Sequence, residues 1–134
     1  MQNRILAMLL VALVLAACSD NKRGDLPVPP ANLLEDAARI TRGERLFAAH
    51  CAECHGSIAE GRTQRAARFN PPAPDFHELR YRESLPGYLY LRIAQGRRLE
   101  PFNSAGSVMP AWEPHLSPEA IWDLVAFLRY RARP

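Results

Sequence analysis

Apolar residues recur at spacings of three and four in three stretches of the chain, which is the pattern of an amphipathic helix. The first stretch runs from about Asp36 into a cysteine pair that begins at Cys51. One face of this stretch holds Ile40, Gly43, Phe47 and Cys51 itself. The pattern therefore predicts a helix that leads directly into the cysteine pair.

The second stretch begins at Pro86, which fits the first turn of a helix, and Gly96 is placed as its C-terminal stop. Leu85, Leu89 and Ile93 fall on one stripe of this segment. We therefore predict a second, shorter helix between the proline and the glycine.

The third stretch has the clearest pattern. Ser117 is a good N-cap, and Pro118 fits the first helical position. The stripe at i, i+3, i+4 and i+7 consists of Ile121, Leu124, Val125 and Leu128. No segment has a convincing strand alternation, so the sequence predicts an all-α fold.

Two segments without a regular period separate the predicted helices. One lies around Pro71, Pro72 and Pro74, and the other covers residues 100–113. Three short helices and two long loops enclose little apolar volume. We therefore expect something besides side chains to fill the centre of the domain.

The chain also begins with an uncharged run, Ile5 to Ala17, which follows the positively charged Arg4. A membrane-spanning helix needs roughly 20 apolar residues, so this run is too short to be a permanent anchor. Leu15-Ala16-Ala17-Cys18 resembles the lipobox of bacterial lipoproteins. The alternative is a plain secretory signal followed by an incidental cysteine.

These features divide the chain into three parts. We expect residues 1–17 to be a lipoprotein signal peptide, and residues 18–31 to be a lipidated N-terminus and proline-rich tether. Residues 32–134 would form the folded domain. Ser19 after the lipidated Cys18 favours the outer over the inner membrane of a bacterial cell envelope, with the domain facing the periplasm.

Composition and charge indicate the class of protein and exclude some functions. The 134 residues are 48% hydrophobic and 23% charged, which is typical of a globular protein. Seventeen Lys and Arg against fourteen Asp and Glu give a net charge of +3, far from the concentrated basic charge that nucleic-acid binding needs. Three cysteines cannot all pair with one another, so at least one has another role.

Cys51-Ala52-Glu53-Cys54-His55 is the c-type haem attachment sequence. Two thiols at this spacing can add to the two vinyl groups on one edge of a porphyrin, and the next residue, His55, can then give the iron an imidazole. A thioredoxin-like redox pair does not need the histidine. A zinc site would need further ligands, which His50, His77 and His115 could nominally supply.

From Asp36 to Arg133 the sequence resembles the class I cytochromes c. Gly43 and Phe47 lie where that family places the glycine and aromatic residue of its first helix, and Leu124 and Phe127 match its last-helix pattern. The resemblance implies a small fold of three to five short helices wrapped around one covalent haem. It also implies that the two helices cross at the glycine.

The second axial ligand is expected to be Met109. It is the only methionine left once the signal is removed, and Ser107-Val108-Met109-Pro110-Ala111-Trp112 resembles the distal-ligand loop of the family. His50, His77 and His115 are the rival ligands. Cys51 and Cys54 would then hold haem c, and His55 and Met109 its iron.

The sequence offers several alternatives for the residues that would contact His55 and the haem propionates. The acceptor for the second nitrogen of His55 is either a carbonyl near Gln64 or one of the later prolines. Tyr88, Trp112, Arg97 and Arg98 are candidate partners of the haem propionates. Arg62, Arg65 and Arg68 form a basic loop that would suit an acidic redox partner if the haem edge lies nearby.

The sequence thus predicts a membrane-tethered monohaem electron-transfer protein without enzymatic activity. Its partners would be periplasmic or membrane redox proteins and, through the lipid on Cys18, a membrane, with neither nucleic acid nor a small-molecule substrate. One alternative is a haem c subunit of a larger oxidoreductase. Others are a haem enzyme or sensor in which Met109 is displaced, and a thiol or zinc module without haem.

Overall fold

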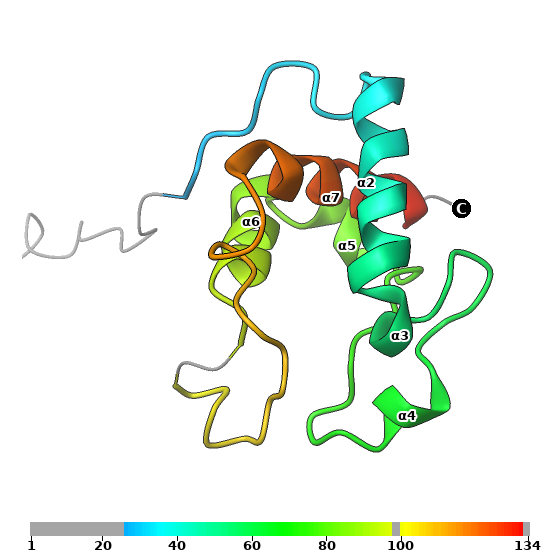
Figure 1. The fold of residues 1–134 in the computed structure, drawn as a ribbon, viewed down its shortest axis with the longest axis vertical. Helices are drawn as coiled ribbons and strands as arrows, with labels where there is room; N and C mark the ends of the chain where they lie inside the picture. Colours follow the sequence, from blue (N-terminus) through cyan, green and yellow to red (C-terminus); the bar gives the residue numbers. More distant parts are fainter. Residues whose placement is uncertain (1–25, 98–99, 133–134) are drawn as a thin grey trace, which may run out of the picture.

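The computed structural model describes residues 26–97 and 100–132, and within these ranges the fold is helical without strands (Figure 1). The expectation of an all-α fold is confirmed. The predicted signal peptide, Cys18 and Arg98 lie outside the described residues. The six described helices are α2 Ala37–His50, α3 Ala52–His55, α4 Gln64–Ala67, α5 Arg80–Glu83, α6 Pro86–Ala94 and α7 Pro118–Arg131.

Side-chain caps start both of the long helices, α2 and α7. The carboxylate of Asp36 accepts a hydrogen bond of 3.0 Å from the backbone N–H of Arg39, and Ser117 Oγ accepts one of 3.2 Å from Ala120. Pro118 occupies the first turn of α7, where its missing N–H has no intrahelical partner to lose. The sequence-based starts of these two helices are therefore confirmed.

Helix α6 differs from its prediction in one residue. Leu89 and Ile93 are buried, but Leu85 is 58% exposed because it precedes the helix and adopts an extended conformation. The stripe therefore begins one turn later than expected. Gly96 follows the helix with a φ of 65°, a left-handed conformation that glycine adopts without strain.

The core forms where α2 crosses α7 at Gly43. A Cβ atom on this glycine would lie 2.0 Å from the carbonyl oxygen of Asp123 and 2.8 Å from Cβ of Phe127. Only the absence of a side chain lets the helices approach so closely. Phe47 packs beside the crossing, with its ring centroid 5.3 Å from that of Phe127. This is the arrangement that the family resemblance implied.

Helix α7 is buried from Ile121 to Leu128, including one charged residue. The Asp123 carboxylate accepts hydrogen bonds of 2.8 Å from Arg39 and 2.8 Å from Arg42, both on α2. The ion pairs compensate a charge that burial would otherwise destabilise. They also fix the register of the two crossing helices.

The described end of the predicted tether lies against α6 (Figure 1). A Cβ atom on Gly87 would lie 2.5 Å from the carbonyl oxygen of Pro27 and 2.9 Å from Cβ of Leu26. Leu33, just before α2, is buried in the core. Among residues 26–97 and 100–132, no helix has the length and apolar character needed to cross a membrane.

Candidate functional site

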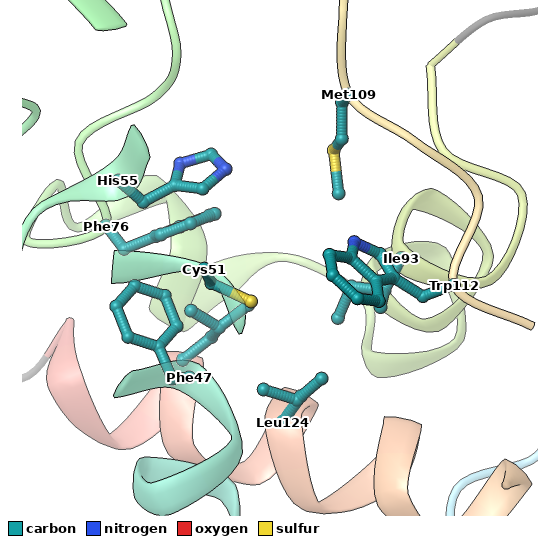
Figure 2. Close-up of a pocket in the computed structure, with 9 residues that line it drawn as sticks. Phe47, Cys51, His55, Phe76, Ile93, Met109, Trp112 and Leu124 are labelled. Carbon is teal, nitrogen blue, oxygen red and sulfur yellow. The ribbon is translucent and has the colours of Figure 1, made fainter. Parts of the chain in front are cut away.

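An apolar pocket lies between α3 and the loop after α4 on one side, α6 and the loop after it on the other, and the crossing helices. It contains about 270 Å³ of space, part of it open to solvent. Figure 2 shows the imidazole of His55 and the thioether of Met109 on opposite sides of this pocket, with Leu124 of α7 at its base. The lining residues are Phe47, Cys51, His55, Phe76, Ile93, Met109, Trp112, Leu124 and Leu128.

His55 is held in one orientation by its surroundings. Its side chain lies at the end of α3 and is only 8% exposed, and its Nδ1 lies 3.2 Å from the carbonyl oxygen of Pro74. With Nδ1–H donating to that oxygen, Nε2 keeps a free lone pair for a metal. Of the acceptors left open by the sequence, the structure favours one of the later prolines over a carbonyl near Gln64.

Burial also sets the charge of this imidazole. Desolvation lowers the pKa of His55 below its ordinary value of 6.5, the hydrogen bond to Pro74 opposes that shift, and the positive charge of Arg131 adds to it. The imidazole is therefore neutral near pH 7, which is the form that binds a metal. Phe76 packs on its ring, with a centroid distance of 4.6 Å.

The two cysteines of the motif are free thiols, and Cys51 lines the same pocket. Cys51 ends α2 and precedes α3, so the change of helix direction places its sulfur at the pocket (Figure 2). Burial, with a smaller contribution from Cys54, raises the pKa of the Cys51 thiol to about 12. Such a thiol is inert as a thiolate nucleophile at neutral pH, which disfavours the thioredoxin-like interpretation of the pair.

Met109 reaches the pocket from the loop that follows α6. Its backbone carbonyl accepts a hydrogen bond of 3.2 Å from Arg97, and the N–H of Trp112 donates to the Ala94 carbonyl at 3.0 Å. A side chain on Gly96 would collide with the Pro110 carbonyl, 2.5 Å from the added Cβ. The loop is thus fastened to the end of α6 at Met109 and in the residues just after it.

The rival histidine ligands lie elsewhere. His50, His77 and His115 are exposed, and none of the three lines the pocket. His77 instead contacts Asp75 and the Ile58 carbonyl, each at 2.9 Å. In the described part of the chain, no group of three or more His, Cys, Asp or Glu side chains could hold a metal ion, which disfavours a zinc site.

Two arginines with buried, unpartnered nitrogens adjoin the Met109 loop. Arg97 stacks on the Phe102 ring at 3.8 Å from its centroid, and Arg92 contacts the same ring at 5.3 Å. Their Nε atoms are buried without a hydrogen-bond partner in the described residues. Arg97 was a predicted propionate partner, whereas Arg92 was missed because an arginine on a helix usually indicates a solvated face.

The other predicted partners of the haem propionates and the predicted basic loop have no buried, unpartnered nitrogen among the described residues. Tyr88 is 44% exposed, and Trp112 lines the pocket. Arg62, Arg65 and Arg68 are all exposed, and Arg65 forms an ion pair with Glu53 of α3. Arg65 therefore lies in α4 rather than in the predicted loop, and its charge is already compensated within the chain.

These residues together fit a haem. The pocket offers an apolar lining, a nitrogen ligand and a sulfur ligand on opposite sides, and a cysteine sulfur at its edge, which is the donor set of a His/Met haem c. The unpartnered Arg92 and Arg97 nitrogens suit the carboxylates of such a group. Neither the imidazole and thioether pair nor the apolar walls would suit a hydrated divalent cation.

Comparison with known proteins identifies a family for this chain. Residues 38–128 match the family model described as cytochrome c oxidase, cbb3-type, subunit III. The matched segment begins in α2, ends in α7 and contains both cysteines of the motif, His55 and Met109. No curated protein matches the chain.

Proposed function

Since the chain belongs to this family of class I monohaem cytochromes c, whose cofactor is covalently bound haem c with iron, we propose that it carries single electrons between redox partners. In this proposal Cys51 and Cys54 hold the haem through thioethers, and His55 and Met109 are its axial ligands. The observation that carries the proposal is the placement of His55 and Met109 on opposite sides of one apolar pocket.

The haem would supply a one-electron iron couple, and the chain would keep its surroundings fixed. Pro74 holds the His55 ring through Nδ1, and the end of α6 holds the Met109 loop through Arg97 and Trp112. Because neither ligand has to move when the charge of the iron changes, little rearrangement would accompany electron transfer. A thioether ligand and an apolar pocket both favour the ferrous state, so the potential would be higher than for two histidine ligands.

The same pair of proposed ligands supports a carrier rather than an enzyme. If His55 and Met109 both bound the iron, no open coordination site would remain for a substrate or a gas. A haem sensor or enzyme would need Met109 to leave, and the hydrogen bonds of its loop to α6 oppose that movement. We therefore propose that the chain alone has no catalytic activity.

Replacement of Met109 by alanine tests the axial ligand. The ferric wild type should show the weak far-red band of methionine bound to haem, and the reduced protein should bind carbon monoxide slowly. In Met109→Ala we expect the band to disappear and carbon monoxide to bind rapidly, because one axial position is open. The matched control is Val108→Ala, whose side chain is 56% exposed beside the same loop. A normal band in Met109→Ala would contradict the assignment.

We also propose an extracytoplasmic location with a lipid anchor. Residues 1–17 would be removed, Cys18 acylated, and the domain held at a bacterial membrane, more readily the outer one, facing the periplasm. Several acyl chains on one residue bind a membrane firmly, whereas a single chain binds only reversibly. Cleavage and acylation both change the mass of the purified chain, so mass spectrometry checks this part of the proposal.

A second candidate function is a haem c subunit of a larger oxidoreductase. The description of the matching family, which names a subunit of a cytochrome c oxidase, favours it. The electron chemistry would be the same, but the protein would not diffuse freely between partners. Extraction with a mild detergent separates the two, because a subunit would purify with further chains and a free carrier would purify alone.

A further inference from the structure

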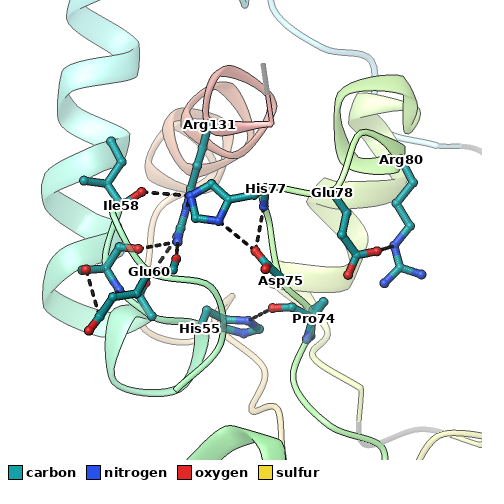
Figure 3. A network of polar contacts seen from close by, with 11 residues as sticks. His55, Ile58, Glu60, Pro74, Asp75, His77, Glu78, Arg80 and Arg131 are labelled. Atoms are coloured by element: carbon teal, nitrogen blue, oxygen red, sulfur yellow. Dashed lines mark hydrogen bonds and ion pairs between the residues drawn. The ribbon is translucent and has the colours of Figure 1, made fainter. Parts of the chain in front are cut away.

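Arg131 at the end of α7 binds the loop that directly follows His55. Its side chain is buried, and the guanidinium donates hydrogen bonds to the carbonyl oxygens of Gly56 at 3.2 Å and Glu60 at 2.6 Å, and to that of Ser57 (Figure 3). One side chain from the last helix thus holds three carbonyls within five residues of the proposed ligand. Loss of these contacts would leave the buried Gly56 carbonyl without the partner that Arg131 supplies, and the loop without its link to α7.

The same guanidinium also contacts the segment that orients the imidazole. Its Nε lies 3.5 Å from Nε2 of His77, and His77 contacts the Asp75 carboxylate at 2.9 Å. Asp75 follows Pro74, whose carbonyl accepts the Nδ1 hydrogen bond of His55. Arg131 therefore contacts two segments near the proposed ligand. One is the loop that follows His55. The other, which it contacts through His77, lies next to Pro74, the hydrogen-bond acceptor of His55.

The charge of Arg131 is poorly compensated for a buried group. Its guanidinium lies over the Phe47 ring, 4.9 Å from the centroid, and Phe47 lines the pocket. Within residues 26–97 and 100–132, no carboxylate lies within 4.0 Å of its nitrogens. Burial lowers the pKa of Arg131, while the more distant Asp75 and Glu60 carboxylates oppose that shift. An arginine remains charged in such a place.

We propose that Arg131 is a positioning residue for His55 and a fixed positive charge that raises the reduction potential of the haem. This inference rests on the proposed function. A cation near the pocket disfavours the additional positive charge of ferric iron, and the low dielectric of the surroundings strengthens this effect. The carbonyl contacts keep the cation at one distance from the imidazole in both oxidation states.

Charge-changing variants test the proposal through the midpoint potential of the haem-loaded protein at fixed pH. Arg131→Gln keeps hydrogen-bond donors but removes the charge. We expect its redox equilibrium to shift about tenfold toward the ferric state, which is 59 mV for a one-electron couple. Arg131→Lys keeps the charge and should retain most of the potential while it lowers the stability to urea. The matched control is Arg129→Gln, two residues earlier on α7, which should leave the potential unchanged.

Asp75→Asn provides a test with the opposite sign. Asparagine still accepts the hydrogen bonds from His77 through its oxygen, but the negative charge that opposes Arg131 is gone. We expect a shift toward the ferrous state. A purely structural role of Arg131 would instead give reduced stability in both variants without opposite shifts of the potential.

The possible outcomes separate this inference from the proposed function. Failure of the proposed function would appear in the wild type, as a chain without covalent haem. Failure of the inference would appear as a normal haem protein in which Arg131→Gln and Arg129→Gln have the same potential. If Arg131→Gln does not accumulate with haem, the potentials of Asp75→Asn and Arg131→Lys test the proposal instead. An unchanged or lower potential in Asp75→Asn would contradict it.

Discussion

At the scale of single residues, the closest backbone approach at the helix crossing is made possible by Gly43. The space that a Cβ would need is occupied by backbone, the carbonyl oxygen of Asp123 at 2.0 Å, and backbone in the middle of a buried helix cannot move aside easily. Alanine favours helix formation by about 1 kcal/mol over glycine, but that gain is smaller than the clash.

Gly43→Ala should therefore lower the free energy of unfolding by about 3 kcal/mol, because the overpacked crossing must shift apart. Urea unfolding of the haem-loaded protein measures the change. The control is Glu44→Ala, an exposed position on the same helix, which should change the stability by no more than about 0.5 kcal/mol. Equal stabilities of Gly43→Ala and wild type would show that the helices do not cross at this glycine.

Some functional residues could be predicted from the sequence because their chemistry depends on local spacing. The motif from Cys51 to His55 is contiguous, and Met109 was singled out by its loop and by the absence of competing methionines. The structure places His55 and Met109 on facing sides of one pocket. Pro74 could only be named as one of several acceptors, because it lies 19 residues from His55 and the tertiary fold makes the contact.

Arg131 was not recognised in the sequence for a physical reason. Basic residues in the last turn of a helix usually interact with its dipole and with water, and α7 carries Arg129 and Arg131 there. What distinguishes Arg131 is a set of carbonyls more than 70 residues away in the chain. Only the fold brings those carbonyls to the helix end.

At the scale of elements, helices α2 and α7 could be predicted because both have long apolar stripes, and α7 could also be predicted with its cap, Ser117. The helices α3, α4 and α5 have four residues each, which is too short for a period to be visible. One turn of helix is also unstable alone and forms only where the tertiary structure holds it. Their positions therefore depend on the packed core and on the site.

The N-cap of α2 predicts a dependence of stability on pH. The hydrogen bond from Arg39 N–H is the main reason why the pKa of Asp36 lies below its ordinary value of 3.8. A carboxyl whose folded pKa is lowered stabilises the protein fully above its unfolded pKa and loses that contribution as the pH falls through the folded value. Asp36→Asn keeps a capping side chain that does not titrate.

We therefore expect the stability advantage of wild type over Asp36→Asn to be constant from about pH 7 to about pH 5 and to shrink below about pH 4. Urea unfolding of the two haem-loaded proteins over this range measures the difference. Glu44→Gln on the same helix, away from the cap, serves as a control for loss of a carboxyl. A difference that stays constant down to about pH 3 would contradict the role of Asp36 as an ionised cap.

At the scale of the whole molecule, the described helices form a frame around the apolar pocket rather than a closed core. The residues from Ile121 to Leu128 and Phe47 pack at the crossing, while the loops that follow α3 and α6 extend beyond it (Figure 1). Few helix–helix contacts hold these loops, so a haem bound between them would contribute much of the stability of the fold. The sequence anticipated this from the small apolar volume that three short helices can enclose.

Covalent haem on Cys51 and Cys54 is the central claim, and mass spectrometry of the purified, native protein tests it most directly. The intact mass should equal that of the chain starting at Cys18, with its acyl groups, plus one haem. A proteolytic fragment spanning Cys51 to His55 should carry the haem mass with no free thiol. An intact mass without haem, together with two free thiols in that fragment, would contradict the account.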